Sequence, residues 1–264
     1  VDPALLARWS HNADLTAPID MAFAAAAQRV VSGKAGTEVL ARMFEDDPIY
    51  KGGEKAALRL PTFLGNHDFG RFAMFVKQAN PGISQDELLA RTMLGHAMML
   101  TQRGVPTIYS GDEQGFVSDG NDQLAREDMF ASKVAVYNDN DLIGTDATTA
   151  QDNFDVRHPL YRLIAELSAV RRSTPALTGG LQKVRAFSDK PGLLAISRFD
   201  SKTGREVVLA FNTSDRPIMN RIAVDPRSLS FATLAGQCAL DAAAPGSLTI
   251  TLPAFGFAVC AAKP

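Results

Sequence analysis

The sequence changes character near residue 178, and this change constrains the fold more than any other feature. Up to about residue 175, short apolar runs alternate with longer segments of helical periodicity, which is the pattern of a parallel sheet with crossover helices. Beyond residue 178 the helical periodicity disappears, and short apolar runs are separated by turn residues such as Asp189-Lys-Pro-Gly192. The pattern predicts an α/β part over residues 1–177 and an all-β antiparallel part over residues 178–264.

The α/β part contains three strand candidates and two helices with clear start signals. The strand candidates are residues 17–23, 60–65 and 105–109. Ser84 and Glu87 have the spacing of a capping box, and apolar residues follow them at helical intervals. Pro159 suits the first turn of another helix, which Pro175 ends. We therefore expect three parallel strands joined by helices.

The β part contains six apolar runs and both cysteines of the chain. The runs are residues 184–187, 193–199, 207–212, 221–224, 248–252 and 255–260. Cys238 and Cys260 do not lie in a Cys-x-x-Cys motif, so the pattern does not predict a zinc cluster or a redox centre. It leaves open whether they are buried thiols or one disulfide.

Composition and charge argue against two classes of partner. With 264 residues and 46% hydrophobic content the chain can bury a large core. A formal net charge of -2 and a pI near 6.1 provide no basic surface for a nucleic acid or an anionic membrane. The chain also has no run of eighteen apolar residues, so it is not predicted to span a membrane.

Polar side chains follow two of the strand candidates. Asn66, His67 and Asp68 come directly after residues 60–65, and an acidic loop framed by glycines follows residues 105–109. Because parallel strands end at the same edge of a sheet, we expect the two endings to share a rim. Amide, imidazole and carboxylate groups together can bind hydroxyl groups or metal ions, so this rim is the candidate functional site.

The order of these motifs resembles a known family. Phe-Leu-Gly-Asn-His-Asp68, then Gly104-Val-Pro-Thr-Ile-Tyr-Ser-Gly-Asp-Glu-Gln-Gly115, then a helix and a small β domain are similar to the C-terminal part of the α-amylase family, glycoside hydrolase family 13. The resemblance covers nearly the whole chain. It implies that the strand candidates are strands 6, 7 and 8 of a (β/α)8 TIM barrel, and that an antiparallel β-sandwich, domain C, follows.

The resemblance also implies a role for each site residue. Asp68 would be the third catalytic carboxylate, which binds sugar hydroxyls and favours a distorted, oxocarbenium-like ring. His67 would donate to a sugar hydroxyl in the same subsite, and Asn66 would orient the loop while bordering the substrate. Arg71 is expected at the substrate-binding rim, and the pair Asp112 and Glu113 is expected to organise loops.

The nucleophile and general acid of this family end strands 4 and 5, upstream of every motif matched here. The resemblance therefore implies that the chain is a C-terminal fragment, inactive alone, of a retaining enzyme that cleaves α-1,4-glucosidic bonds in starch or maltooligosaccharides. In such enzymes the two reacting groups lie about 5 to 5.5 Å apart. The chain is expected to hold no metal, whereas calcium stays open for the intact enzyme.

The implied partners are an α-glucan and the missing N-terminal half of the barrel. That half would cover the two open edges of a three-stranded sheet, whose backbone groups otherwise lack partners. The sequence leaves the location of the protein open, and the family resemblance is compatible with a secreted or periplasmic one.

Two other classes of protein share some of these features. One is a carbohydrate-binding or assembly module built around the β part, although the chain has one tryptophan, Trp9, and no Trp or Tyr stripe in that part. The other is a metallophosphoesterase, because Gly65-Asn-His-Asp68 is similar to one of its metal-ligand motifs. That site needs an upstream Asp-x-His and further histidines, and the chain has four histidines in all. Of these, His96 is expected to be a partly buried imidazole with its hydrogen bonds satisfied.

Overall fold

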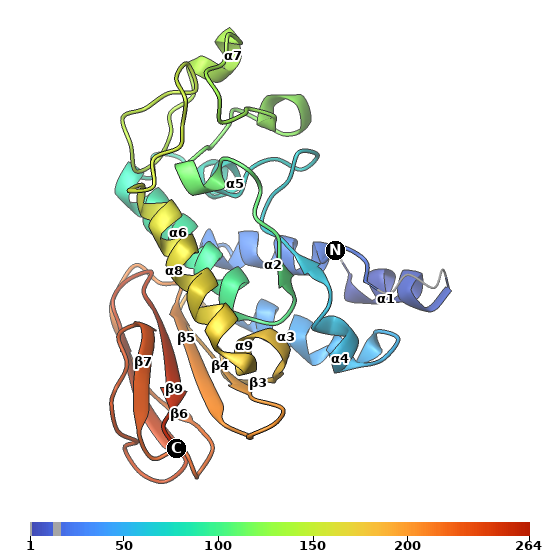
Figure 1. Cartoon of the computed structure of the whole chain (residues 1–264), viewed down its shortest axis with the longest axis vertical. Helices are drawn as coiled ribbons and strands as arrows, with labels where there is room; N and C mark the ends of the chain where they lie inside the picture. Colours follow the sequence, from blue (N-terminus) through green and yellow to red (C-terminus); the bar gives the residue numbers. More distant parts are fainter. Residues whose placement is uncertain (1, 13–16) are drawn as a thin grey trace.

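The computed structural model describes residues 2–12 and 17–264, with helices at one side of a β-sandwich (Figure 1). Two short strands, β1 and β2, lie among the helices. The elements before the sandwich are α1 Pro3–Asn12, α2 Met21–Val31, α3 Glu38–Glu45, η1 Asp47–Ile49, α4 Glu54–Ala57, β1 Pro61–Thr62, α5 Phe72–Ala79, α6 Gln85–Thr101, β2 Val105–Pro106, η2 Asp112–Gln114, η3 Asp122–Ala125, α7 Ala135–Asn138, α8 Pro159–Ser173 and α9 Pro175–Gly179. None of the described helices has the length and apolar character needed to cross a membrane.

The sandwich consists of two antiparallel sheets. Its strands are β3 Leu181–Ala186, β4 Leu193–Phe199, β5 Glu206–Asn212, β6 Ile218–Ala223, β7 Phe231–Gly236, β8 Ser247–Leu252 and β9 Phe257–Ala262. Five strands form a sheet in the order β3-β4-β5-β9-β7, and β6 pairs with β8 in a second sheet. Along β4, Leu193 and Ala195 belong to the core between the two sheets, whereas Leu194 and Ile196 belong to the core shared with the helices. This alternation buries the large sheet on both faces.

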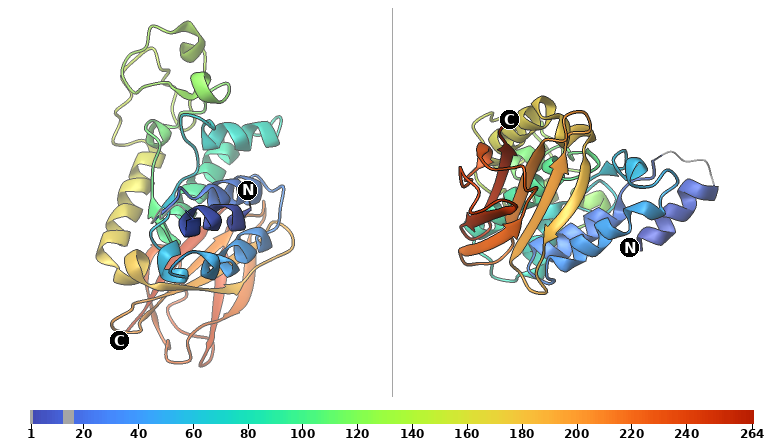
Figure 2. Two further views of the ribbon diagram at one scale, coloured as in Figure 1. Left: turned by 90° about the vertical axis from the view of Figure 1, so that its right-hand side faces the viewer. Right: turned by 90° about the horizontal axis from the view of Figure 1, so that it is seen from below.

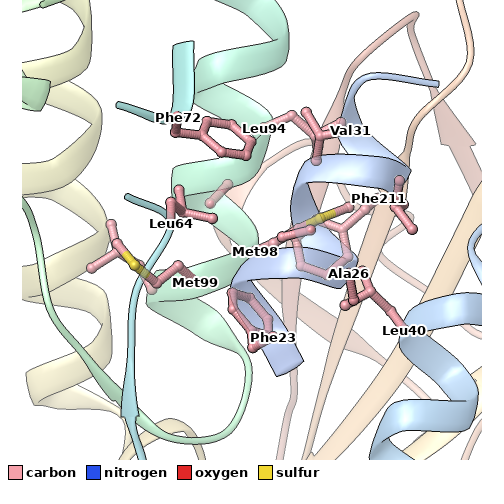
Figure 3. Close-up of a cluster of buried hydrophobic side chains, with 14 of the residues drawn as sticks. Phe23, Ala26, Val31, Leu40, Leu64, Phe72, Leu94, Met98, Met99 and Phe211 are labelled. Atoms are coloured by element: carbon pink, nitrogen blue, oxygen red, sulfur yellow. The ribbon is translucent and has the colours of Figure 1, made fainter. Parts of the chain in front are cut away.

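The helical core is continuous with the large sheet. Phe211 of β5, Met98 of α6 and Leu40 of α3 are all fully buried and lie in one cluster with Phe23 of α2 (Figure 3). Burial of four such side chains stabilises the joint by about 1.5–3 kcal/mol each. The sheet and the helices therefore share one hydrophobic core.

Helix α6 passes through the middle of this core. Ser84 caps its N-terminus by accepting a hydrogen bond from Glu87 N at 3.2 Å, as the capping-box spacing predicts. Helix α8 begins at Pro159, also as predicted, and packs along α6 (Figures 1 and 2). In space, both helices extend from the region of the 118–156 loop towards the β-sandwich (Figure 2).

Two buried arginines bind the carbonyl groups at the C-terminal end of α6. Arg171 of α8 donates to Leu100 O at 2.9 Å and to Gln102 O at 3.0 Å, and Arg198 of β4 donates to Thr101 O at 3.1 Å. Arg198 also donates to two carbonyls at the end of α9. Burial lowers the pKa of Arg171 to about 10 and that of Arg198 to about 9. The partial negative charge of a helix C-terminus thus takes the place of a carboxylate partner.

A disulfide joins Cys238 to Cys260 of β9, with the Cα atoms 5.8 Å apart. The structure thus decides between two buried thiols and one disulfide, which the sequence leaves open. The two cysteines are 22 residues apart in the chain, so the bond ties the segment after β7 to the strand that pairs with β7. A crosslink of this kind restricts the unfolded chain.

Two strand predictions in the helical part hold only in their first residues. Strands β1 and β2 pair in parallel, with Pro61 opposite Val105 and Thr62 opposite Pro106, but each ends after two residues. Each strand contains a proline, which has no N–H to donate to the sheet. The carboxyl ends of β1 and β2 nevertheless lead into the two predicted loops.

The predicted strand over residues 17–23 is wrong. Asp20 Oδ1 accepts a hydrogen bond from Phe23 N at 3.0 Å, so Asp20 is the N-cap of α2 and the chain is helical from Met21. Helix α2 is buried over most of its surface, and such a helix has no polar face to distinguish it from a buried strand. Among the described residues, one hydrogen bond of the expected pairing remains, from Asp20 N to Pro61 O at 2.8 Å.

Strand β7 was absent from the predicted strands. Its pairing with β9 shifts register between Thr233 and Ala235, and this irregularity disturbs the alternation of buried and exposed residues. Each of the other six strands of the sandwich overlaps one of the apolar runs in the sequence.

We expect Arg198→Met to lower the free energy of unfolding by about 3 kcal/mol, because three buried carbonyls would lose their donor. Urea denaturation of the purified chain measures this. Arg221→Met is the matched control, since Arg221 is exposed on β6 and its loss should change stability by no more than about 0.5 kcal/mol. Equal effects of the two substitutions would contradict the role given to Arg198.

We expect removal of the disulfide by a Cys238→Ala, Cys260→Ala double substitution to lower the free energy of unfolding by about 3 kcal/mol, because the unfolded chain gains the freedom of the opened loop. Thermal unfolding with and without a thiol reductant provides the control. The reductant should destabilise the unsubstituted chain and leave the double variant unchanged. A chain that is insensitive to reductant under unfolding conditions would argue against the disulfide.

Candidate functional site

Residues Asn66 to Gly70 form a closed turn after β1. Asn66 N donates to Gly70 O at 3.1 Å, and Gly70 N donates to Asn66 O at 2.9 Å. The side-chain oxygen of Asn66 accepts from the backbone N–H groups of Asp68 and Phe69, both at 2.9 Å. Gly70 has φ of 113°, and a Cβ there would lie 2.7 Å from Met74 Cε. The turn is therefore held from inside by Asn66 and closed by a glycine.

The turn presents His67 and Asp68 to solvent. Their side chains are 59% and 65% exposed, and His67 Nε2 lies 3.4 Å from Asp68 Oδ1. Arg126 Nη2 approaches the same Asp68 oxygen at 3.6 Å and lies 2.7 Å from Asp122 Oδ1. Acceptor oxygens and N–H donors thus stand side by side on an exposed turn, an arrangement that can bind the hydroxyl groups of a sugar.

Arg71 lies behind the turn, inside the protein. Its side chain is fully buried, Nε donates to Glu127 Oε2 at 2.8 Å, and Nη1 donates to Asp112 Oδ1 at 3.1 Å. Nη1 also donates to Ser110 O at 2.9 Å, and Nη2 to Glu127 O at 3.0 Å. The expectation that Arg71 binds substrate at the rim is therefore corrected. Three residues after Asp68 the chain turns inward into α5, and Arg71 ties together the loops that surround the site.

Two aromatic rings enclose the guanidinium of Arg71. Its central carbon lies 4.4 Å from the ring centre of Tyr109 and 5.0 Å from that of Phe116. The hydroxyl of Tyr109 donates to Ala125 O at 2.7 Å, and burial raises the pKa of Tyr109, which favours the protonated, donating form. Hydrogen bonds from Tyr109 and Arg71 thus hold the backbone carbonyls of Ala125 and Glu127. The side chain of Arg126, which lies between them in the chain, is directed towards Asp68.

The structure brings together Asn66, His67 and Asp68, as the motif predicts. Asp112 binds Arg71 and so organises a loop, in agreement with its expected role. Neither Arg126 nor Glu127 was among the predicted site residues, because both lie in a polar stretch that is typical of a solvated loop. The alternation of buried Ala125, exposed Arg126 and buried Glu127 is visible only in the folded chain.

Among residues 2–12 and 17–264, no three His, Cys, Asp or Glu side chains form a group that could hold a metal ion. In this part of the chain the metallophosphoesterase alternative has no ligand set.

Comparison with known proteins identifies the family to which this fold and the exposed pair of His67 and Asp68 belong. Residues 52–180 match the family model described as "Alpha amylase, catalytic domain". The chain is 39% identical over 254 residues to an α-amylase of Streptomyces lividans, an alignment that covers 96% of this chain and 28% of that protein. The chain belongs to the α-amylase family, glycoside hydrolase family 13.

Solved structures share the fold. The α-amylase of Geobacillus thermoleovorans complexed with acarbose superposes with a TM-score of 0.73 at 17% identity, covering 100% of this chain and 51% of that chain. AmyP in complex with maltose superposes with a TM-score of 0.66 at 16% identity, covering 91% of this chain and 49% of that chain. The present chain thus spans about half of these solved chains and 28% of the Streptomyces protein.

We expect Arg71→Met to lower the free energy of unfolding by about 3–5 kcal/mol, because buried Asp112 and Glu127 would lose their cation. Chemical denaturation measures the change. Arg157→Met is the control, since the side chain of Arg157 is 87% exposed and its ion pair with Asp155 contributes little. If both variants were as stable as the unsubstituted chain, Arg71 would not hold the loops of the site.

Proposed function

We propose that this chain forms one side of the active site in a retaining α-glucan hydrolase that cleaves α-1,4-glucosidic bonds in starch or maltooligosaccharides. The observation that carries the proposal is the exposed pair of His67 and Asp68, held on a rigid turn at the carboxyl end of β1. Family membership and the sugar-bound structures of the same fold support it.

The proposed role of Asp68 is to favour the transition state of glycosidic bond cleavage. Positive charge develops at the anomeric carbon, and the neighbouring hydroxyls become better donors to a carboxylate. A hydrogen bond to Asp68 would then be stronger in the transition state than in the bound substrate, so it would raise kcat. Asn66 and the buried cluster of Arg71, Asp112 and Glu127 fix the turn before substrate binds. The turn therefore does not have to be ordered during the reaction.

His67 and Arg126 are proposed to bind the same sugar from either side of Asp68. Each lies within 3.6 Å of Asp68 Oδ1 and carries N–H donors, whereas the carboxylate can only accept. Together the three groups match a hydroxyl that both donates and accepts.

We infer that β1 and β2 are strands 7 and 8 of a (β/α)8 barrel, and that residues 17–20 lie at the position of strand 6. The parallel pairing of β1 with β2 and the hydrogen bond from Asp20 N to Pro61 O support this order. On this assignment residues 1–177 are the C-terminal part of the barrel and residues 178–264 are domain C. Ile19 and Val105, on opposite sides of β1, are 50% and 51% exposed, as expected where further parts of a barrel would pack.

The nucleophile and the general acid are proposed to come from the remainder of the parent protein, which would also cover these exposed side chains. Whether the parent requires calcium is left open by the sequence. The disulfide supports export, because such bonds persist in oxidising compartments.

We expect Asp68→Asn in the parent enzyme to lower kcat by about 100-fold or more and to change KM less, because the lost interaction acts in the transition state. Hydrolysis of maltoheptaose measures both constants. Asp119→Asn is the matched control, since Asp119 is an exposed loop carboxylate. The 264-residue chain alone should not release sugar from starch.

Two results would contradict this assignment. Hydrolysis by the chain alone that disappears with Asp68→Asn would show that it contains its own reacting pair. Calorimetric binding of maltoheptaose that is unaffected by Asp68→Asn and His67→Ala would favour a binding module instead.

A further inference from the structure

His96 is a fully buried imidazole on α6, close to the Arg71 cluster. Its Nδ1 lies 2.9 Å from Thr92 O, one turn earlier in the helix. A carbonyl oxygen only accepts, so Nδ1 carries a hydrogen and donates it. Its Nε2 lies 3.6 Å from Asp112 Oδ2 and has no hydrogen-bond partner among the described residues. The second ring nitrogen thus faces a carboxylate.

The protonation of Nε2 decides whether this contact is favourable. In a neutral imidazole with hydrogen on Nδ1, Nε2 presents a lone pair, which would oppose the negative oxygen of Asp112. An unpaired polar atom in a buried site costs about 1–3 kcal/mol. With hydrogen on both nitrogens, the same contact becomes an ion pair.

The charge of the buried cluster favours the form of His96 with hydrogen on both ring nitrogens. The side chains of Arg71, Asp112 and Glu127 are at most 6% exposed, and they carry one positive and two negative charges. A net negative charge in the interior is strongly unfavourable unless another cation compensates it. His96, at 1% side-chain exposure, is in contact with the carboxylate that Arg71 shares.

The aromatic ring that meets His96 from the neighbouring helix carries no charge. The ring of Phe72 from α5 meets the imidazole edge-on at 6.4 Å. The residues of α8 in this core, Leu160, Leu163 and Leu167, are apolar. Among the described residues, Asp112 is the carboxylate that His96 contacts.

We propose that His96 is doubly protonated at neutral pH and is a positioning residue that completes the buried charge cluster of Arg71, Asp112 and Glu127. It acts through Asp112 on Arg71, which holds the turn of Asp68 and the loop of Arg126. The four charges come from four separate segments of the chain, so the cluster fixes those segments relative to one another. Only the effect on turnover rests on the proposed function.

Nitrogen-15 NMR of the labelled 264-residue chain tests the protonation directly, because four histidines give few signals. At neutral pH we expect both nitrogens of His96 to show shifts of the protonated type. Asp112→Asn should return Nε2 to the acceptor type, because the compensating negative charge is lost. An acceptor-type Nε2 in the unsubstituted chain would overturn the proposal. This holds both for a neutral His96 beside a protonated Asp112 and for a neutral His96 beside an ionised Asp112.

Asp119→Asn is the matched control for this experiment, since it removes an exposed carboxylate in the same loop. It should leave the His96 signals unchanged. A change as large as that caused by Asp112→Asn would show that the signals report general loop structure, which also contradicts the proposal.

In the parent enzyme, His96→Gln should lower kcat at neutral pH by about tenfold, corresponding to about 1.4 kcal/mol. His96→Lys, which keeps a cation, should restore part of this loss and extend activity to more alkaline pH. If the glutamine and lysine variants had the same pH profile as the unsubstituted parent, His96 would not position the site through its charge. A parent without glycosidase activity would refute the proposed function and leave the NMR result standing.

Discussion

The rest of the structure depends on the hydrogen bonds that Arg171 and Arg198 donate to the C-terminal carbonyl groups of α6. A helix end inside a protein leaves carbonyl groups that water cannot reach, and each needs a donor. Here one arginine comes from the next long helix and the other from the β-sandwich. The same hydrogen bonds therefore complete α6 and join the sandwich to the helices.

Helix α6 also supports the candidate site around Asp68. Helix α6 carries His96, which contacts Asp112, and Asp112 binds the guanidinium that holds the loops around Asp68. The role proposed for Asp68 requires that the carboxylate act without reorganising, so its supports must themselves be ordered. The buried charges provide this order, while the exposed pair of His67 and Asp68 remains free to meet a ligand.

Local signals predicted the parts of the fold that local interactions stabilise. The helix after Ser84, the helix at Pro159 and the turn of Asn66 depend on hydrogen bonds or backbone preferences within a few residues, so they can be inferred from spacing alone. The predictions for residues 17–23 and Arg71 were wrong because burial decided them. A helix buried on most sides has no amphipathic pattern, and an arginine next to a motif can turn either outwards or inwards. The register shift in β7 likewise depends on its partner strand.

The sequence by itself determined the family, the change from helices to strands near residue 178 and the motif that places Asp68 after a strand. These features are encoded in residue order, and they do not require knowledge of distant contacts. Only the tertiary structure decided that Cys238 and Cys260 are bonded, that Arg126 approaches Asp68 and that Arg71 lies among Asp112, Glu127 and two aromatic rings. Each of these contacts joins residues far apart in the chain, and the geometry of packing selects them from many partners of similar chemistry.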